Sequence, residues 1–181
     1  MDRLQNRVAI VTGGSSGIGR GIALAFANEG ACVVVADIQE EPRRGKYHET
    51  DLRSPTADQI AADGGTAVFV ETDLSSIEQI ESMVATTVER FGGLDILVNN
   101  AGMNIPEPFV DVSEDHYDQI MALNVKAAFL VSQTVARVMI SGKGGAILNV
   151  SSQMGHVGAA NRTVYCTSKH ALEGLTKAMA V

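Results

Sequence analysis

Tyr165 and Lys169 are four positions apart in a segment with helical periodicity, and Ser152 precedes Tyr165 by thirteen positions. Residues four apart lie on the same face of a helix, so the two side chains would meet there. A phenol has an ordinary pKa of about 10, and a nearby ammonium group lowers that pKa. A hydroxyl such as that of Ser152 can stabilise negative charge on a reacting oxygen. Together the three residue types indicate proton transfer to or from a substrate oxygen.

Each of these features also has a plainer interpretation. A Tyr and a Lys at this spacing occur by chance on solvent-exposed helices, and Ser152 fits a turn or a helix cap as well as a site. Asn124 lies between Leu123 and Val125 in an expected helix. Because Asn is a poor helix former, this position indicates either a structural hydrogen bond or a role in a site.

A glycine-rich segment, residues 12–19, joins the first apolar run to an expected helix. Gly13 can adopt a turn conformation that other residues avoid, Gly17 lets the backbone approach a pyrophosphate, and Gly19 permits close contact between helix and sheet. The free N–H groups at the start of the helix would face the phosphates. The alternative is a tight connection that binds nothing. We predict a phosphate-binding turn whose cofactor-binding residues are Gly13, Ser15, Ser16, Gly17, Ile18 and Gly19.

Asp37 ends the second apolar run, roughly 20 residues beyond the glycines, as in dinucleotide-binding folds. A carboxylate at this place accepts hydrogen bonds from the 2′-hydroxyl of an adenosine ribose and repels a 2′-phosphate. The sequence therefore favours NAD over NADP as the cofactor. Arg43 and Arg44 follow closely, and one of them could approach a 2′-phosphate if the chain folds back. A solvated charged loop is the alternative.

These residues need a framework, and the apolar pattern predicts one. Five short β-branched runs alternate with longer segments of helical periodicity, which is typical of a parallel sheet covered by helices. The expected strands are residues 8–11, 32–36, 67–70, 96–98 and 146–150. Four helices are expected, the first at residues 18–28. The second begins with a capping box at residues 75–78 and ends near Phe91. The third runs from Ser113 toward Ile140, and the fourth from about Tyr165 onward. The predicted fold class is therefore α/β, a Rossmann-like doubly wound parallel sheet with five strands visible.

Residues 39–57 break this alternation, because they carry charges and prolines without an apolar period. We interpret them as an extended surface loop, which is longer than most connections between a strand and a helix. The alternative is a functional flap over the cofactor.

Composition narrows the class of protein. The chain has 181 residues, of which 45% are hydrophobic and 19% charged, and its formal net charge is -7. This length predicts a single NAD(P)-binding domain over residues 1–181, and the negative charge argues against nucleic acid as a partner. Two cysteines are too few for a disulfide framework, no Cys/His cluster has metal-ligand spacing, and no apolar run reaches the roughly 18 residues of a membrane span. We expect a cytoplasmic protein that binds neither metal nor membrane.

The combination of motifs resembles the short-chain dehydrogenase/reductase family from about Arg7 to the end of the chain. The matching features, in the family's order, are Thr12-Gly13-x-x-x-Gly17-x-Gly19, Asp37, Asp73-Leu74, Asn99-Asn100-Ala101-Gly102, Asn124, Ser152 and Tyr165-x-x-x-Lys169. The resemblance implies that Tyr165 transfers the proton, that Lys169 lowers its pKa and holds the nicotinamide ribose, and that Ser152 binds the substrate oxygen. Tyr165 and Lys169 therefore belong to the expected cofactor-binding residues as well as to the catalytic ones. It also implies that Asn124 supports a water-linked proton relay to the lysine.

The same resemblance implies further cofactor contacts. It places Asn100, Ala101 and Gly102 in a turn near the adenosine side of the cofactor. It places Asp73 and Leu74 at the adenine, although Asp73 also fits a charge at the N-terminus of a helix.

By this resemblance the expected activity is hydride transfer between NAD(H) and a small secondary alcohol or ketone, through a Ser-Tyr-Lys site completed by Asn124. Reductases of 3-oxoacyl thioesters and dehydrogenases of sugars or polyols are the most similar members. A homo-oligomer, either dimer or tetramer, is the expected assembly. A Rossmann methyltransferase is an alternative that gives the Ser-Tyr-Lys set no purpose.

Family members continue beyond the Tyr-Lys helix with two more strands, which this sequence lacks. We therefore expect the sequence to be a fragment of a complete enzyme whose C-terminal strands are absent. The alternative is a natural short form, namely a catalytically inactive dinucleotide-binding or scaffold protein. In both cases residues 146–150 would form an apolar edge of the sheet.

Overall fold

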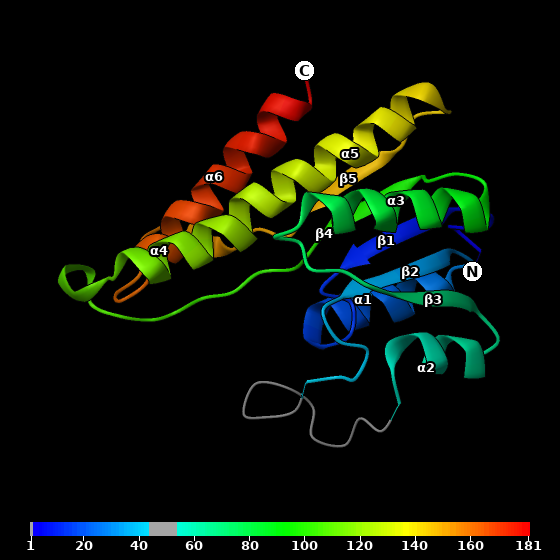
Figure 1. Ribbon diagram of the computed structural model, residues 1–181, viewed down its shortest axis with the longest axis horizontal. Coiled ribbons are helices and arrows are strands. Elements are labelled where there is room, and N and C mark those ends of the chain that lie inside the picture. Colours follow the sequence, from blue (N-terminus) through cyan, green and yellow to red (C-terminus); the bar gives the residue numbers. More distant parts are fainter. Residues whose placement is uncertain (1, 44–53) are drawn as a thin grey trace.

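The computed structural model describes residues 2–43 and 54–181. Most of the predicted loop 39–57, including Arg44, therefore lies outside the described residues. Within them the chain forms a parallel sheet with helices on both faces (Figure 1).

Five parallel strands form the sheet in the order β3-β2-β1-β4-β5. They are β1 (Val8–Thr12), β2 (Cys32–Asp37), β3 (Thr66–Glu71), β4 (Ile96–Asn99) and β5 (Ala146–Asn149). The predicted Rossmann-like doubly wound sheet is confirmed, and every predicted strand end lies within one residue of the observed one. Strand β5 forms one edge of the sheet, and its Leu148 is exposed.

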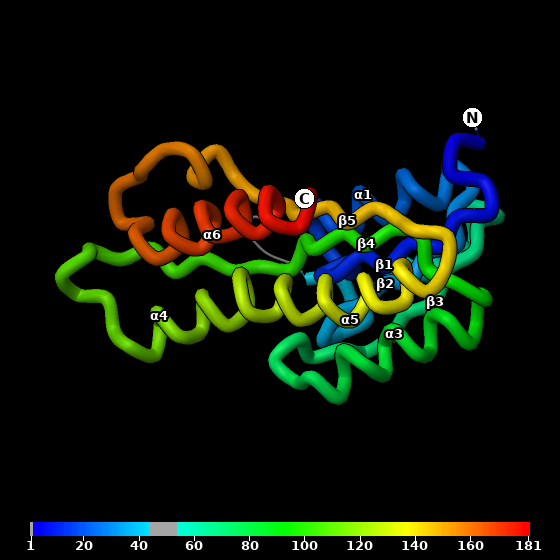
Figure 2. The backbone as a smooth tube through the Cα atoms, turned by 90° about the horizontal axis from the view of Figure 1, so that it is seen from above, coloured from blue at the N-terminus to red at the C-terminus, as the bar shows by residue number. Residues whose placement is uncertain are grey.

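The helices alternate with the strands along the chain. They are α1 (Gly17–Asn28), α2 (Thr56–Ala62), α3 (Ile77–Phe91), α4 (Glu114–Met121), α5 (Ala128–Ser141) and α6 (Thr163–Met179). A π-helical segment, η2 (Ala122–Ala127), joins α4 to α5, and the single-turn helices η1 (Phe109–Asp111) and η3 (Gln153–Gly155) precede α4 and α6. Helix α6 runs beside α4 and η2 (Figure 2), so the Tyr-Lys helix is supported by the helix that contains Asn124.

Alternate residues of the strands enter two hydrophobic cores on opposite faces of the sheet. In β1, Ile10 belongs to the core under α3 and α5, whereas Val11 belongs to the core under α1 and α2. Both side chains are fully buried. Burial on both faces explains why the central strands read as continuous apolar runs and not as an alternating pattern.

Helix α2 is absent from the sequence prediction, and the predicted loop 39–57 is wrong at its end because Thr56 and Ala57 open this helix. Seven residues are too few to show a clear helical period. Thr56, Ala57 and Ile60 are buried, and α2 packs against α1 and β3. Tertiary packing therefore stabilises a helix that its own sequence signals only weakly.

Two other predicted helix boundaries also change. The capping box at 75–78 is wrong, because Ser76 is the N-cap of α3 and its Oγ accepts a hydrogen bond from the Gln79 N–H at 3.3 Å. The Gln79 side chain in turn accepts from the Asp73 N–H at 2.7 Å. Helix α6 begins at Thr163, two residues before the predicted start at Tyr165.

The predicted helix from Ser113 toward Ile140 starts as expected, since the Ser113 Oγ accepts a hydrogen bond from the His116 N–H at 3.2 Å. Its middle differs, because residues Ala122–Ala127 are π-helical. Segments of this kind occur often at functional sites. Asn124 lies within this one.

The stretch Glu114–Ser141 is long and apolar enough to cross a membrane by length and composition alone. Of its most apolar window, 39% is buried, and α5 contributes Val131 and Val135 to the core against β1 and β4. A core helix of a globular protein meets the same criterion, so this is weak support for a membrane span.

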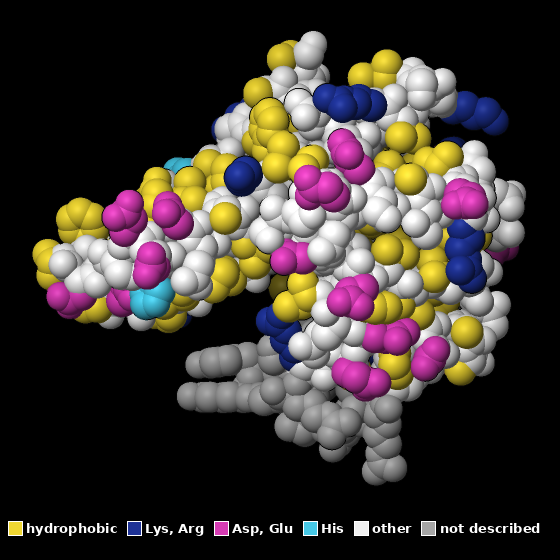
Figure 3. All heavy atoms as spheres, viewed as in Figure 1, with side chains coloured by type: hydrophobic (Ala, Val, Ile, Leu, Met, Phe, Trp, Pro, Cys, Tyr) yellow, Lys and Arg dark blue, Asp and Glu magenta, His cyan; other side chains and the backbone are white. Residues whose placement is uncertain are grey.

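An arm formed by η1 and α4 extends beyond the sheet (Figure 1). Phe109 and Val110 in η1 are 73% and 86% exposed. Hydrophobic and acidic side chains lie together on this arm (Figure 3). The predicted homo-oligomer stays a prediction.

The carboxyl ends of the five strands lie along one edge, because all the strands are parallel. The chain proceeds from β1 outward through β2 to β3 and then returns to β4 on the other side of β1. In open α/β sheets, ligands bind outside the carboxyl ends of the strands at such a reversal. The glycine-rich turn, Asn100 and Ser152 follow β1, β4 and β5, and Asp37 is the last residue of β2.

Candidate active site

The glycine-rich turn between β1 and α1 has the backbone conformation that its glycines predict. Gly13 and Gly17 have φ angles of 64° and 53°, in the left-handed region that favours glycine. A Cβ added to Gly19 would collide with the carbonyl oxygen of Gly13 and with the side-chain amide of Asn100. Gly19 therefore permits the close approach of α1 to the turns that follow β1 and β4.

The N-terminus of α1 is not capped by a side chain. Ser16 occupies the N-cap position, but its Oγ accepts a hydrogen bond from the Arg43 N–H at 2.6 Å, and the first turn of α1 contains no acidic residue. The Ser15 Oγ is buried and has no hydrogen-bond partner among residues 2–43 and 54–181, whereas Ile18 is 69% exposed. This end of α1 is therefore free to interact with an anion.

Asp37 lies beside this turn. Its Oδ2 accepts a hydrogen bond from the Ser15 N–H at 3.1 Å, and its Oδ1 accepts from the Ile38 N–H at 2.8 Å. A carboxylate has about four lone-pair positions, so both oxygens can accept one more donor each. The backbone therefore orients Asp37 without exhausting its capacity to bind a ligand.

Asn100 braces the turn after β1. Its Nδ2 donates to the carbonyl oxygens of Thr12 and Gly13 at 3.0 and 3.2 Å. The Thr12 Oγ1 accepts from the backbone N–H groups of Asn100 and Ala101 at 3.0 and 3.1 Å. A Cβ added to Gly102 would lie 3.2 Å from the Asn124 Oδ1. These contacts join the turns of β1 and β4, and the predicted adenosine contacts of Asn100, Ala101 and Gly102 stay predictions.

Asp73 and Leu74 follow β3. The Asp73 Oδ1 accepts a hydrogen bond from the Ser75 N–H at 2.8 Å, and this contact holds the pKa of Asp73 below its ordinary value. Leu74 is buried in the core under α3. Asp73 thus stabilises the turn that leads into α3, and the predicted adenine contact stays a prediction.

Tyr165 and Lys169 lie on one face of α6, as their spacing predicts. The Lys169 Nζ is 5.6 Å from the centroid of the Tyr165 ring and donates a hydrogen bond to the Val150 carbonyl oxygen at 2.7 Å. Lys169 is only 5% exposed, and burial lowers its pKa from the ordinary value. The structure therefore places a buried ammonium group beside the phenol and anchors it to the end of β5.

Ser152 is the N-cap of η3. Its Oγ accepts a hydrogen bond from the Met154 N–H at 3.2 Å, so the interpretation as a helix cap is correct. A hydroxyl also has one proton to donate, and this backbone bond does not use it. Ser152 can therefore cap η3 and donate to a ligand at the same time.

Asn124 is 1% exposed and makes the structural hydrogen bonds that its position in a helix suggests. Its Oδ1 accepts from the Met103 N–H at 2.8 Å, and its Nδ2 donates to the Met103 carbonyl oxygen at 2.9 Å and to the Ser168 Oγ at 3.0 Å. The Ser168 hydroxyl then donates to the Tyr165 carbonyl oxygen at 2.8 Å. Asn124 thus joins the chain after β4 to the first turns of α6, and its relay role stays a prediction.

Ser168 is a site residue that the sequence did not predict. It is fully buried and connects Asn124 to the backbone of Tyr165. A polar residue three positions after Tyr165, on a helix already expected to pack, is the only sequence signal that could have suggested it.

The lowered pKa of Lys169 predicts a pH dependence of stability. In the unfolded chain Lys169 keeps its proton up to a pH of about 10.4, whereas in the folded protein it releases the proton at lower pH. Between these two pKa values the unfolded state binds more protons, so the free energy of unfolding rises with pH by at most about 1.4 kcal/mol per unit. Urea unfolding at increasing pH should show this rise in the wild type relative to Lys169→Met.

Lys177→Met is the matched control, because Lys177 lies exposed on the same helix. The difference between wild type and this control should stay constant with pH. Equal slopes for wild type and Lys169→Met would contradict the assignment.

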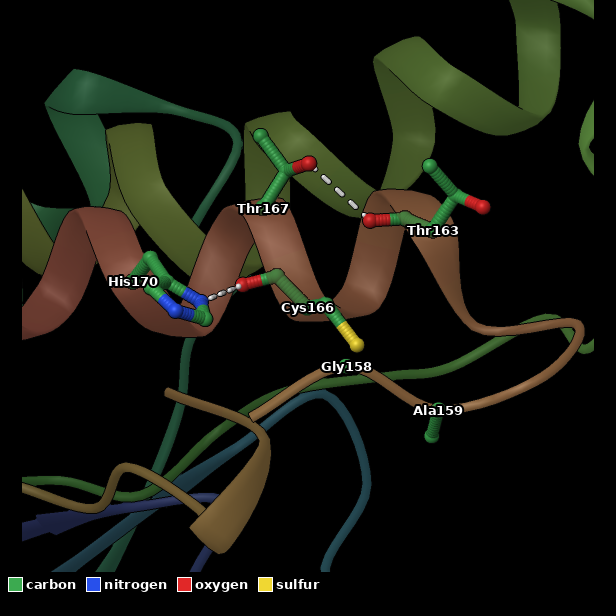
Figure 4. A pocket seen from close by; sticks show the side chains of 6 residues that line it. All are labelled: Gly158, Ala159, Thr163, Cys166, Thr167 and His170. Atoms are coloured by element: carbon green, nitrogen blue, oxygen red, sulfur yellow. Dashed lines mark hydrogen bonds between the residues drawn. The ribbon is translucent and has the colours of Figure 1, made fainter. Parts of the chain in front are cut away.

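A hollow of about 460 Å³ lies on another face of α6, between that helix and the segment before it (Figure 4). Its lining residues are Gly158, Ala159, Thr163, Cys166, Thr167 and His170. None of the predicted site residues lines it.

Among the residues described, no group of three or more His, Cys, Asp and Glu side chains could hold a metal ion.

Relatives with assigned names include dehydrogenases of sugar alcohols. The chain is 39% identical to galactitol 2-dehydrogenase from Agrobacterium fabrum, over 99% of this chain and 65% of that protein. It is also 39% identical to sorbitol dehydrogenase from Cereibacter sphaeroides, over 97% of this chain and 64% of that protein. The chain thus spans about two thirds of the length of these curated relatives.

A solved structure from Beutenbergia cavernae, named for an NAD(P)-dependent gluconate 5-dehydrogenase, has NADP bound at low occupancy. It superposes with a TM-score of 0.85 at 33% identity, over 98% of this chain and 66% of that chain. The family model for short chain dehydrogenases matches residues 7–181 of this chain. This chain therefore belongs to the short-chain dehydrogenase family.

Proposed function

We propose that the protein transfers a hydride between NAD(H) and a secondary alcohol or ketone of the polyol class. The observation that carries this proposal is the buried Lys169 ammonium group, which lies beside the Tyr165 ring and donates to the carbonyl oxygen of Val150, directly after β5 and two residues before Ser152. The roles below are those that this arrangement supports in a protein of this family.

The turn between β1 and α1 fits a dinucleotide. The uncapped N-terminus of α1 suits the pyrophosphate. The buried Ser15 Oγ, which has no hydrogen-bond partner among residues 2–43 and 54–181, would bond to the same group. Asp37 retains acceptor capacity for the hydroxyls of the adenosine ribose. Gly13, Ser15, Ser16, Gly17, Ile18, Gly19 and Asp37 would hold this half of the cofactor, with Asp73, Leu74, Asn100, Ala101 and Gly102 as further contacts. When bound, the nicotinamide group supplies or accepts the hydride.

Tyr165 acts as the general acid when a ketone is reduced and as the general base when an alcohol is oxidised. In the reducing direction negative charge develops on the substrate oxygen, and the Tyr165 hydroxyl donates its proton to that oxygen. The Lys169 ammonium, 5.6 Å from the ring, favours the negative charge that remains on the phenol. A neutral side chain at position 169 would give no such stabilisation.

Ser152 stabilises the same substrate oxygen. Because its Oγ already accepts from the Met154 N–H, its orientation is set before substrate binds, and its own proton stays available for the substrate oxygen. Asn124 holds the first turns of α6 through Ser168, so it positions Tyr165 relative to the turn after β4.

The polyol class is suggested by two relatives, which are named as galactitol and sorbitol dehydrogenases. The preference for NAD follows from Asp37, since its carboxylate would repel a 2′-phosphate. The NADP bound in the Beutenbergia cavernae structure belongs to that protein, so the preference needs a direct test.

The test uses the 181-residue chain itself. We expect NADH to bind more tightly than NADPH by about tenfold or more, as measured by fluorescence titration, because the 2′-phosphate meets a carboxylate. We also expect NADH to form when NAD and a secondary polyol such as sorbitol or galactitol are added. Binding without turnover across a broad alcohol panel would instead support a catalytically inactive dinucleotide-binding protein. Tighter binding of NADPH would overturn the cofactor assignment.

A further inference from the structure

The peptide group that joins Gly14 to Ser15, in the phosphate-binding turn, is hydrogen-bonded at both its N–H and its carbonyl oxygen. The N–H of Ser15 donates to the Asp37 Oδ2 at 3.1 Å. The Gly14 carbonyl oxygen accepts from the Thr56 Oγ1 at 2.9 Å. Thr56 is 1% exposed and opens α2, so two distant segments fix the plane of this single peptide.

Arg20 determines the direction of the Thr56 hydroxyl. The Arg20 Nη1 donates to the Thr56 Oγ1 at 3.0 Å and to the Ser54 carbonyl oxygen at 3.0 Å. A guanidinium group can only donate, so the Thr56 oxygen must accept from it. The one proton of Thr56 is then directed to Gly14. Arg20 is 5% exposed, which makes its charge-assisted bonds stronger than bonds at the surface.

The peptide that Thr56 holds controls two groups of the candidate cofactor site. Its N–H end orients Asp37, the proposed partner of the adenosine ribose. Its next residues, Ser16 and Gly17, begin α1, whose free N–H groups would face the pyrophosphate. A rotation of this one peptide would therefore disturb both the ribose and the pyrophosphate contacts.

We propose that Thr56 and Arg20 are positioning residues for dinucleotide binding, because they lock the Gly14–Ser15 peptide in the orientation that presents Asp37 and the start of α1 to an ADP-ribose group. This inference rests on the proposed function only in so far as it assumes a dinucleotide. Both residues are buried, so they act through this peptide and not by contact with the ligand. Their effect falls on the adenosine half of the site and is independent of Tyr165 and Lys169.

The test measures ADP-ribose affinity by calorimetry in Thr56→Val, which keeps the shape of the side chain and removes the hydroxyl. The dissociation constant should rise about three- to tenfold, which is the range expected for the loss of one hydrogen bond. The Ser15 amide proton should also exchange faster with solvent in the variant without ligand. Thr56→Ser, which restores the hydroxyl, should recover most of both properties.

Thr87→Val is the matched control. Thr87 is 0% exposed and its hydroxyl donates to the Met83 carbonyl oxygen within α3, away from the turn. This variant removes a buried hydroxyl of the same kind and should leave the ADP-ribose affinity unchanged. If Thr56→Val does not fold, Thr56→Ala removes the hydroxyl without the second methyl group and serves in its place.

The outcomes separate this inference from the proposed function. Wild-type affinity and wild-type exchange of the Ser15 amide in Thr56→Val would overturn the inference and leave the proposed function intact. An equal loss of affinity in Thr87→Val would also overturn it, since the effect would then follow from stability alone. Failure of the wild type to bind ADP-ribose would overturn both.

Discussion

Alcohol oxidation by a Tyr165→Phe variant should fall by about 10²- to 10⁴-fold, the usual contribution of a positioned general acid or base. Phe keeps the aromatic ring that lies 5.6 Å from the Lys169 Nζ, so the packing of α6 and the position of the ammonium group should persist. Only the proton that moves to the substrate oxygen is lost. NADH affinity should therefore stay within about twofold of the wild-type value, because the hydrogen bonds that hold the phosphate-binding turn, to Asp37, Thr56 and Asn100, do not involve the Tyr165 hydroxyl.

Steady-state assays with a polyol substrate and a parallel NADH titration would measure both effects. Tyr117→Phe is the matched control, because Tyr117 is 44% exposed on α4 and no predicted site residue depends on it. Its turnover should equal that of the wild type. Retained turnover in Tyr165→Phe would reject the acid and base role, and a joint loss of turnover and NADH binding would show that the hydroxyl has a structural function.

A Gly19→Ala variant should lose ADP-ribose binding by more than about tenfold and unfold more easily by about 1–3 kcal/mol. The added Cβ would collide with the Gly13 carbonyl oxygen and with the Asn100 side-chain amide. The Gly13 oxygen is a backbone atom, so it can move only if the whole turn moves. That turn also contains the Gly14–Ser15 peptide and the N-cap of α1, which explains why one methyl group should affect both binding and stability.

Gly21→Ala is the control for this prediction, because it adds the same methyl group two residues further along α1. Apart from its chain neighbours and the backbone of its own helix, no atom of residues 2–43 and 54–181 lies within 4 Å of a Cβ at Gly21. Helix propensity then dominates, and this variant should be more stable than the wild type by up to about 1 kcal/mol, with unchanged ADP-ribose binding. Urea unfolding and calorimetry on the two variants should thus give opposite signs in stability. Equal behaviour of the two variants would show that the collision does not occur.

The local pattern was sufficient to predict the strands and most helices. The central strands β1 and β2 are buried on both faces, so their β-branched runs are continuous and easy to recognise. The sequence did not predict helix α2, because its seven residues are stabilised by packing on α1 and β3 and show no long apolar period. The sequence did not predict the π-helical turn at Asn124 for a similar reason, since the contacts of Asn124 with Met103 and Ser168 join segments that are distant in the chain.

The residues that could carry the chemistry were recognisable from type and spacing. Tyr165 and Lys169 share a helix face because the helical period is a local property, and the same is true of the turn geometry of Gly13 and Gly17. Their partners were not recognisable in this way. Nothing in the sequence near Gly14 indicates that Thr56, more than forty positions away, holds its carbonyl group.

The sequence alone determined which groups this protein possesses: a phenol, an ammonium group, a hydroxyl, a carboxylate and a flexible turn, each at the end of a strand or on one helix face. Tertiary structure alone decided how each group is held. Ser152 both caps η3 and keeps a proton to donate, and Asn124 supports Tyr165 through Ser168. Asp37 and Thr56 form hydrogen bonds with the same peptide group, the one that joins Gly14 to Ser15. The physical reason is that helix and turn geometry follow from neighbouring residues, whereas hydrogen bonds between separate segments depend on how those segments pack in space.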